Sequence, residues 1–181
     1  MTVAVARKRI NQDWWSDPAL KESFNPLPID LDWDWSTVSL ELDGRRIRTK
    51  KMTAITGDGA VQGATMVSSD PVPSLLDAGQ QCLFVELLFV APRNRPALRI
   101  DGRPYLQGVG SELLAWGAWF SRHLGHHGRL RLDGSPDFVD WYEKRGLQRL
   151  PIEPTVYEGV TYVPMELPPG AADRLLVTWP G

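Results

Sequence analysis

The sequence has little of several features that mark specialised classes of protein. It contains a single cysteine, Cys82, so no intramolecular disulfide can form, and we expect the protein to work in the reducing cytoplasm. It has no apolar run of about eighteen residues, and Arg7, Lys8 and Arg9 follow only a few small apolar residues at its start. We therefore expect neither a membrane partner nor a hydrophobic signal sequence. A formal net charge of −2 gives no basic excess, which argues against nucleic acid as a partner.

Histidine is scarce as well. The three histidines of the chain, His123, His126 and His127, form one H-x-x-H-H group. A structural zinc site takes four ligands, usually cysteine and histidine, and outside this group the chain offers only Cys82, which we expect to be a buried, unreactive thiol. We therefore predict that the protein binds no metal.

What is present suits one globular domain. A chain of 181 residues with 43% hydrophobic content can bury a sizeable core, so we predict a single domain over residues 1–181. Residues 1–36 hold four of the eight tryptophans. We interpret these as packing the segment onto the fold as a lid; lining an acceptor pocket or a dimer contact is the alternative. Residues 168–181 form a C-terminal tail that is apolar enough to dock.

A buried strand followed by an amphipathic helix forms the centre of the chain. Residues 82–90 are apolar on both faces, which is typical of a central strand covered on two sides, and Glu86 is the lone carboxylate among them. At the start of this run, Cys82 is expected to be a buried, unreactive thiol rather than an acyl carrier. The helix that follows has apolar residues at three- and four-residue spacing: Leu113, Trp116, Gly117, Phe120 and Leu124.

A glycine turn, Gly108-Val109-Gly110, lies at the start of this helix. Glycine lets the backbone approach a ligand closely, and the amide groups at the N-terminus of a helix attract anions. The turn therefore predicts a phosphate-bearing cosubstrate.

A second motif lies nearer the C-terminus, where residues 137–147 read DFVDWYEKRGL after a predicted strand at 129–133. The buried strand, a V-x-P sequence at residues 90–92, the glycine turn, the amphipathic helix and this segment, in that order, resemble the GNAT superfamily of acyl-CoA-dependent N-acyltransferases. The resemblance covers residues 53–167. It implies an α+β fold of three layers, with a mixed, mostly antiparallel central sheet of seven strands, helices on both faces, and a splay between the fourth and fifth strands.

Alternation and turn signals place the elements of this sheet. One further helix is expected over residues 135–145, where Ser135 is a capping residue and Gly146 ends the helix. The stretch between residues 150 and 161 reads as a long proline-containing loop. The expected strands are residues 37–42, 46–56, 60–68, 82–90, 129–133, 147–150 and 161–167.

The resemblance also implies a reaction, in which an acetyl group moves from acetyl-CoA to a primary amine of a small molecule or a protein by direct attack. The backbone of Leu88, Phe89 and Val90 would bond to the pantetheine arm. Ser135 stands where many members of the family have an asparagine that contacts this arm, although a helix cap also explains it. The pyrophosphate would be held by backbone amides of the turn: Leu106, Gln107, Gly108, Val109, Gly110 and Ser111.

Two side chains are candidates for proton transfer. A lysine-like amine has a pKa near 10.4 and is mostly protonated at pH 7, so a positioned base contributes typically ~10²- to 10⁴-fold to the rate. Glu86 is the candidate base, because family members often carry acidic residues on this strand; a structural carboxylate paired with an arginine is the alternative. Tyr142 matches the family's tyrosine that protonates the departing thiolate; a core aromatic is the alternative.

The sequence departs from the family in two places. Tyr105 stands where the family usually has Arg or Gln, and the connection between Val90 and Gly108 is longer than usual. These departures support a second hypothesis, a non-catalytic acyl-CoA-binding or protein-interaction module on the same fold. The family often forms homodimers, so a homodimer is consistent with the resemblance.

Overall fold

The computed structural model describes residue 14 and residues 50–57, 59–98, 105–157 and 159–177. Several sequence-based expectations lie outside these residues. They concern the strand at 37–42, the segment 1–36 apart from Trp14, residues 99–104 of the long connection, and the end of the tail at 178–181.

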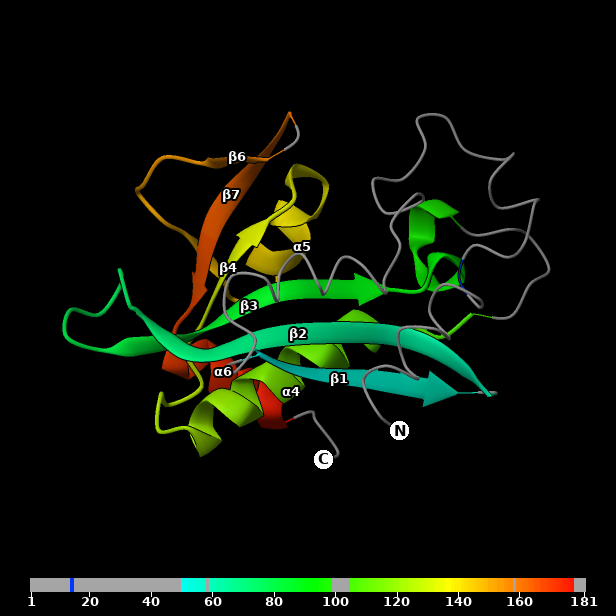
Figure 1. Cartoon of the computed structure of the whole chain (residues 1–181), viewed down its shortest axis with the longest axis horizontal. Helices are drawn as coiled ribbons and strands as arrows, with labels where there is room; N and C mark the ends of the chain where they lie inside the picture. Colours follow the sequence, from blue (N-terminus) through cyan, green and yellow to red (C-terminus); the bar gives the residue numbers. More distant parts are fainter. Residues whose placement is uncertain (1–13, 15–49, 58, 99–104, 158, 178–181) are drawn as a thin grey trace. The chain divides into compact units, whose positions relative to one another are not determined.

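Within the described residues, seven strands form a mixed, mostly antiparallel sheet with helices, which is the fold class that the sequence predicted (Figure 1). The strand order is β1-β2-β3-β4-β7-β5, and β6 pairs with β7. β3 and β4 are parallel, whereas β4, β5 and β6 all pair antiparallel with β7. The strands are β1 (Lys50–Gly57), β2 (Ala60–Pro73), β3 (Gln81–Val90), β4 (Leu130–Gly134), β5 (Gln148–Arg149), β6 (Thr155–Tyr157) and β7 (Val160–Leu167).

Apart from the single helical residue Trp14, the described residues form three α-helices and short 3₁₀ turns. The α-helices are α4 (Val109–His123), α5 (Val139–Glu143) and α6 (Pro169–Val177). The 3₁₀ turns are η2 (Pro92–Asn94), η3 (Pro96–Leu98) and η4 (Pro136–Phe138). None of the described helices combines the length and the hydropathy needed to cross a bilayer.

Two expectations about these elements were wrong, and the tail contains a helix that was not predicted. The predicted loop between residues 150 and 161 contains β6, which forms a hairpin with β7. The tail contains the helix α6, whose first residue is a proline, a residue suited to the first turn of a helix. The helix expected over residues 135–145 is instead η4 followed by the short α5, and the Ser135 side chain makes no capping hydrogen bond.

The chain divides into two compact units. The first contains residues 1–64 and 88–113, and the second contains residues 65–87 and 114–181. In the first unit, Gly63 of β2 allows the start of α4 to pack closely. A Cβ atom at Gly63 would lie 2.6 Å from Val109 Cγ1 and 2.9 Å from Leu113 Cδ1, so a larger residue would push the helix away.

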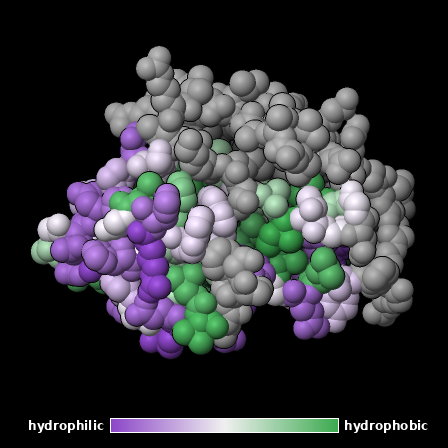
Figure 2. Space-filling model, turned by 90° about the horizontal axis from the view of Figure 1, so that it is seen from below, coloured by the Kyte–Doolittle hydropathy of each residue, from purple (hydrophilic) through white to green (hydrophobic). Residues whose placement is uncertain are grey.

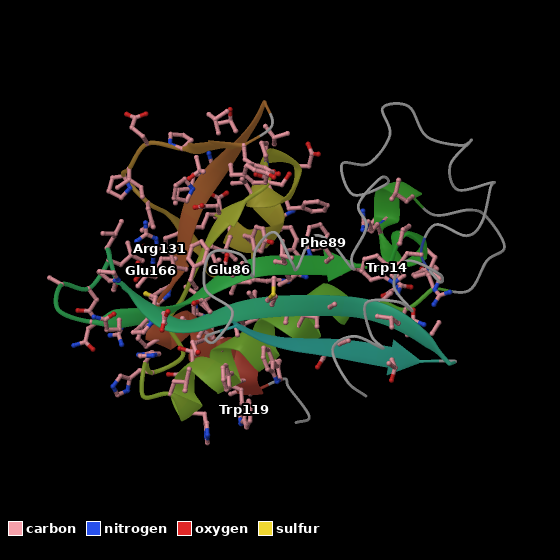
Figure 3. All side chains as sticks on the ribbon, viewed as in Figure 1. Trp14, Glu86, Phe89, Trp119, Arg131 and Glu166 are labelled. Carbon is pink, nitrogen blue, oxygen red and sulfur yellow. The ribbon has the colours of Figure 1, made fainter. Side chains whose placement is uncertain are left out.

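In the second unit, the strands have one polar and one apolar face. Phe84, Arg131 and Glu166 are consecutive partners across β3, β4 and β7, and paired residues share a face, so the two charged side chains are neighbours (Figure 3). The opposite face is apolar and buried, and consists of Leu83, Val85, Leu130, Leu132, Met165 and Leu167.

Helices cover this apolar face or pack beside it within the second unit. Gly117 of α4 lies over Leu130, whose Cδ1 is 3.5 Å from the position of an added Cβ. α6 packs through its alanines: Ala172 Cβ lies 2.7 Å from an added Cβ at Gly128. An exposed ion pair between Arg122 and Asp173 joins α4 and α6.

The surface of the described residues is mixed in character. Figure 2 shows a largely hydrophilic area beside smaller hydrophobic ones. The exposed large apolar side chains come from different elements, among them Trp119 on α4, Val156 and Tyr157 on β6, and Val177 on α6. Scattered exposure of this kind is ordinary for a protein surface.

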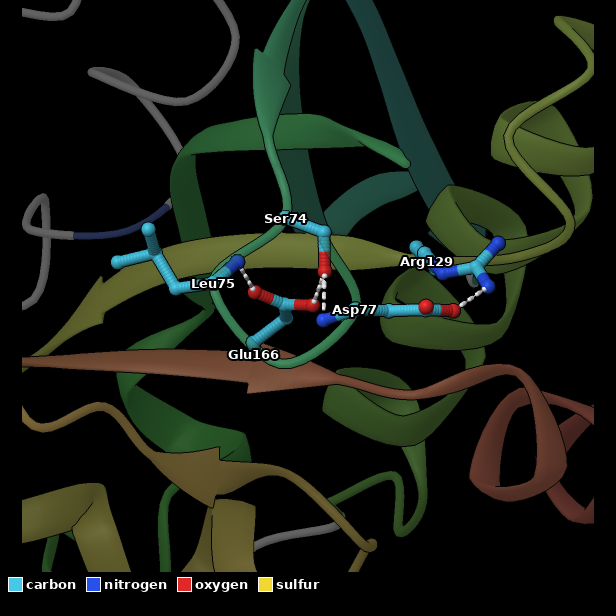
Figure 4. Close-up of polar contacts among 5 residues, drawn as sticks. All are labelled: Ser74, Leu75, Asp77, Arg129 and Glu166. Atoms are coloured by element: carbon cyan, nitrogen blue, oxygen red, sulfur yellow. Dashed lines mark hydrogen bonds and ion pairs between the residues drawn. The ribbon is translucent and has the colours of Figure 1, made fainter. Parts of the chain in front are cut away.

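Glu166 is fully buried and fastens the connection between β2 and β3 (Figure 4). Its carboxylate accepts hydrogen bonds from the Ser74 hydroxyl and, at 2.8 Å, from the Leu75 N–H. The Ser74 oxygen in turn accepts the Asp77 N–H at 2.9 Å, and the Asp77 carboxylate pairs with the buried Arg129. One carboxylate on β7 therefore holds a turn that is distant in sequence.

Replacing Glu166 with alanine should lower the free energy of unfolding by about 2–6 kcal/mol, because two donors lose their acceptor and each costs about 1–3 kcal/mol. Denaturant unfolding of the purified variant measures this change. Glu166→Gln is the matched control: its amide oxygen still accepts the Leu75 N–H, so it should lose less. A Glu166→Ala variant as stable as the wild type would contradict the role of this carboxylate.

Candidate functional site

The glycine turn before α4 is open and has a backbone conformation that favours glycine. Gly108 has φ +82°, in the left-handed region, and nothing lies within 4 Å of the position of an added Cβ. Packing therefore does not require glycine here. The backbone conformation does, because a side chain in this region costs roughly 1–2 kcal/mol.

Three backbone N–H groups of this turn are not used by the described part of the fold. The Glu112 N–H makes a helical hydrogen bond to the Gly108 carbonyl at 3.0 Å. The N–H groups that precede it, on Gly108, Val109 and Gly110, have no acceptor among the described residues. Three donors at the N-terminus of a helix, beside an exposed glycine, fit the oxygen atoms of a phosphate.

Leu106, Gln107 and Ser111, the other predicted phosphate contacts, differ in their hydrogen bonds and in their exposure to solvent. The Leu106 N–H donates to Asn94 Oδ1 at 2.7 Å, so this amide already has an acceptor within the protein. Gln107 is exposed, and its side chain donates to the Tyr105 hydroxyl at 3.1 Å. Ser111 is half-buried in the first turn of α4.

The predicted pantetheine-binding backbone also lies in the first unit. Leu88, Phe89 and Val90 are half-buried residues at the end of β3. The Val90 carbonyl accepts a hydrogen bond from Arg95 Nε at 2.6 Å. The Val90 carbonyl, which the sequence analysis assigned to the pantetheine arm, is therefore already hydrogen-bonded to a side chain of the protein.

Glu86 lies where β3 separates from β4. The pairing of these described strands ends at Val85 and Leu132, whereas β3 continues to Val90 and β4 to Gly134. These are the fourth and fifth strands of the sequence-based count, so the predicted splay is present. Glu86 is the first residue of β3 beyond the pairing, and it is half-buried (Figure 3).

Tyr142 lies at the same end of the pairing, on the other face of the sheet. Its ring carbon Cδ2 is 3.3 Å from the position of an added Cβ at Gly134, on the face opposite to that of Glu86. It is 8% exposed, contacts Trp141 edge to face, and has no hydrogen-bond partner among the described residues. Burial raises the pKa of Tyr142 to about 12, so the phenol stays protonated at neutral pH.

Ser135, a predicted contact to the pantetheine arm, and Cys82, the expected unreactive thiol, both lie within the packed part of the fold. Ser135 is half-buried and precedes η4, and its backbone carbonyl accepts the Phe138 N–H at 2.9 Å. Cys82 is fully buried, and burial, followed by the neighbouring Glu166, raises the pKa of its thiol to about 12. A thiol held protonated in this way is a poor nucleophile. No group of three or more His, Cys, Asp or Glu among the described residues is arranged to hold a metal ion.

The sequence did not single out Asn94 and Gln62, which make buried hydrogen bonds next to the glycine turn. Asn94 lies within the connection that is longer than usual for the GNAT superfamily, and a polar residue in such a connection reads as solvated. No pattern in the sequence indicates that it is buried.

Comparison with solved structures identifies the fold. A "histone acetyltransferase HPA2 and related acetyltransferase" from Corynebacterium glutamicum is similar, with a TM-score of 0.57, 12% identity and 93% of each chain covered. A protein assigned to the GNAT family of acetyltransferases from Desulfovibrio desulfuricans has a TM-score of 0.51 and 18% identity, with 82% of this chain and 87% of that chain covered.

A third similar structure is a GNAT family acetyltransferase from Elizabethkingia anophelis with acetyl-CoA bound. It has a TM-score of 0.51 and 13% identity, with 80% of this chain and 93% of that chain covered. No protein-family model matches the sequence, and a comparison with curated proteins finds no match. At these identities the likeness concerns the fold alone, and it shows that the chain has the fold of the GNAT acetyltransferases.

Proposed function

We propose that this protein is an N-acetyltransferase that moves an acetyl group from acetyl-CoA to a primary amine of a small molecule or a protein. The observation that carries the proposal is the turn at Gly108 on a GNAT fold, where three backbone N–H groups have no acceptor among the described residues and nothing lies within 4 Å of an added Cβ at Gly108. The similar structure from Elizabethkingia anophelis, which has acetyl-CoA bound, supports this choice of donor.

The proposed contacts to acetyl-CoA use the backbone. The N–H groups of Gln107, Gly108, Val109 and Gly110, with Ser111 at the end of the turn, bind the diphosphate through hydrogen bonds and the helix dipole. The backbone of Leu88 and Phe89 is proposed to bond to the pantetheine arm. We retain Ser135 as a proposed contact to that arm.

In the proposed reaction the amine nitrogen attacks the thioester carbonyl carbon, a C–N bond forms and the C–S bond breaks. Glu86 takes the proton that the amine loses, directly or through water. The sulfur leaves as a thiolate and receives a proton from the Tyr142 hydroxyl. The Tyr142 hydroxyl carries this proton at neutral pH, because burial raises its pKa.

Two measurements on the wild-type protein test the proposal. Calorimetry should detect acetyl-CoA binding, and a chromogenic thiol reagent should detect CoA release with at least one amine from a panel of small amines and peptides. Cys82 is buried, so the protein itself adds little to the thiol signal. Absence of binding at hundreds of micromolar acetyl-CoA would reject the proposal. Binding without turnover on any amine would favour the non-catalytic module instead.

Replacing Tyr142 with phenylalanine should lower kcat by about 10- to 100-fold, at or below the lower end of general-acid effects. The effect is modest because a thiol with a pKa near 8.5 is already a tolerable leaving group. Steady-state kinetics at saturating acetyl-CoA measure the change. An unchanged kcat would assign Tyr142 a purely structural role.

Tyr142→Phe should also change how the free energy of unfolding depends on pH in alkaline solution. The folded pKa of Tyr142, about 12, lies above the unfolded value near 10, so the folded protein holds this proton more tightly. The resulting stabilisation is fully present below about pH 10 and is lost as the pH rises to about 12. Unfolding measured across this range should show a shallower loss in Tyr142→Phe than in the wild type.

A further inference from the structure

A buried pair of side-chain amides lies in the first unit, between β2 and the connection that follows β3. Asn94, the last residue of η2, is 6% exposed, and Gln62 of β2 is 2% exposed. Asn94 Nδ2 donates to Gln62 Oε1 at 2.8 Å and to the Gln62 carbonyl at 3.3 Å. Gln62 Nε2 donates to the Gly57 carbonyl at 2.8 Å. The backbone N–H of Ala91 adds a bond to the Gln62 carbonyl at 2.8 Å, so Asn94 is bonded to a well-anchored strand.

The other end of the Asn94 amide reaches the glycine turn. Its Oδ1 accepts the Leu106 N–H at 2.7 Å, and Leu106 precedes Gly108 by two residues. Asparagine is suited to this position because its short side chain both donates and accepts. Aspartate would lose the donor to Gln62, and alanine would lose both.

The bond from Asn94 matters because the chain at the turn is exposed. Tyr105, Leu106, Gln107 and Gly108 are all exposed, and Leu106 Cδ1 is 3.2 Å from the position of an added Cβ at Gly57. Exposed backbone that is not held in place must be ordered when a ligand binds. Fixing one residue costs the equivalent of roughly tenfold in affinity.

We infer that Asn94 is a positioning residue, which holds the turn at Gly108 in the arrangement that binds the diphosphate of acyl-CoA. The inference rests on the proposed function, since it concerns the same anion site. In this view, the first part of the long connection after β3 has a structural role, because η2 places Asn94 where it bonds both to β2 and to the turn.

Asn94→Ala should raise the Kd for acetyl-CoA about 10-fold, because the turn must then be ordered on binding. The kcat at saturating acetyl-CoA should not change. Acetyl-pantetheine, which lacks the diphosphate, should bind the variant and the wild type equally well. Val61→Ala is the matched control. It truncates a buried side chain on β2, next to Gln62 in the sequence, and should destabilise the protein without changing the Kd for acetyl-CoA.

Hydrogen exchange gives a readout that needs no activity. In the wild type without ligand, the Leu106 amide should exchange slowly, and Asn94→Ala should make it fast. Acetyl-CoA should slow the amides of Gly108, Val109 and Gly110 in the wild type.

Three results would overturn the inference alone, provided that the wild type binds acetyl-CoA more tightly than acetyl-pantetheine. They are a Leu106 amide that exchanges freely in the wild type, an unchanged Kd in Asn94→Ala, or an equal loss of both ligands in that variant. A wild type that binds neither ligand would overturn the proposed function and this inference together.

Discussion

Replacing Gly108 with glutamate should weaken acetyl-CoA binding by at least about 100-fold, because like charges placed next to each other cost several kcal/mol. The carboxylate would extend from the position where the diphosphate is proposed to bind. The side chain would also strain a residue whose φ is +82°, at a cost of roughly 1–2 kcal/mol. Isothermal titration calorimetry of the variant with acetyl-CoA measures the change.

Gly79→Glu is a closely matched control for this variant. Gly79 has φ +81°, is exposed, and has nothing within 4 Å of an added Cβ, so glutamate introduces the same charge and a similar strain. It lies between β2 and β3 and takes no part in the hydrogen bonds that hold the glycine turn. Acetyl-CoA binding by Gly79→Glu should equal that of the wild type. If the two variants lose affinity equally, the diphosphate does not bind at Gly108.

Replacing Glu86 with glutamine should lower kcat by about 10²- to 10⁴-fold, the usual contribution of a positioned general base. Glutamine keeps the shape of the side chain and loses its ability to take a proton. The Kd for acetyl-CoA should stay unchanged, because the proposed diphosphate contacts come from the glycine turn. Single-turnover kinetics with an amine substrate and calorimetry separate these two effects.

The pH dependence of Glu86→Gln adds a second test. A lysine-like amine becomes neutral as the pH approaches its pKa near 10.4, and a neutral amine has less need of a base. The deficit of the variant should therefore shrink as the pH rises. Glu143→Gln removes an exposed carboxylate paired with Arg149 and should leave kcat unchanged. A Glu86→Gln variant as active as the wild type would support the structural alternative for this residue.

Prediction succeeded where the pattern is local. The buried run at residues 82–90 and the apolar stripe of the following helix report which faces are covered, and β3 and α4 form over these residues. The DFVDWYEKRGL segment contains the short helix α5, and its Gly146 has positive φ, as expected of a residue that follows the last turn of a helix. The order of these elements resembles the GNAT superfamily, and the expected fold class followed from that resemblance.

Prediction failed where an element depends on a distant partner. β6 has three residues, all exposed, and it exists because it pairs with β7. Its sequence shows no alternation that would separate it from the prolines before it. α6 is a helix whose buried residues are two alanines, which pack against glycines outside the helix, so its apolar stripe is narrow.

The sequence by itself determined the order of strand, glycine turn and helix, because hydrophobic periodicity and glycine placement act over a few neighbouring residues. Only the tertiary structure decided which groups at the turn remain available. It showed that the Leu106 amide is bonded to Asn94, and that Asn94 is bonded to Gln62, which lies 32 residues away in the sequence. Buried polar groups must find partners wherever the fold brings them, so their pairing depends on contacts that no local pattern records.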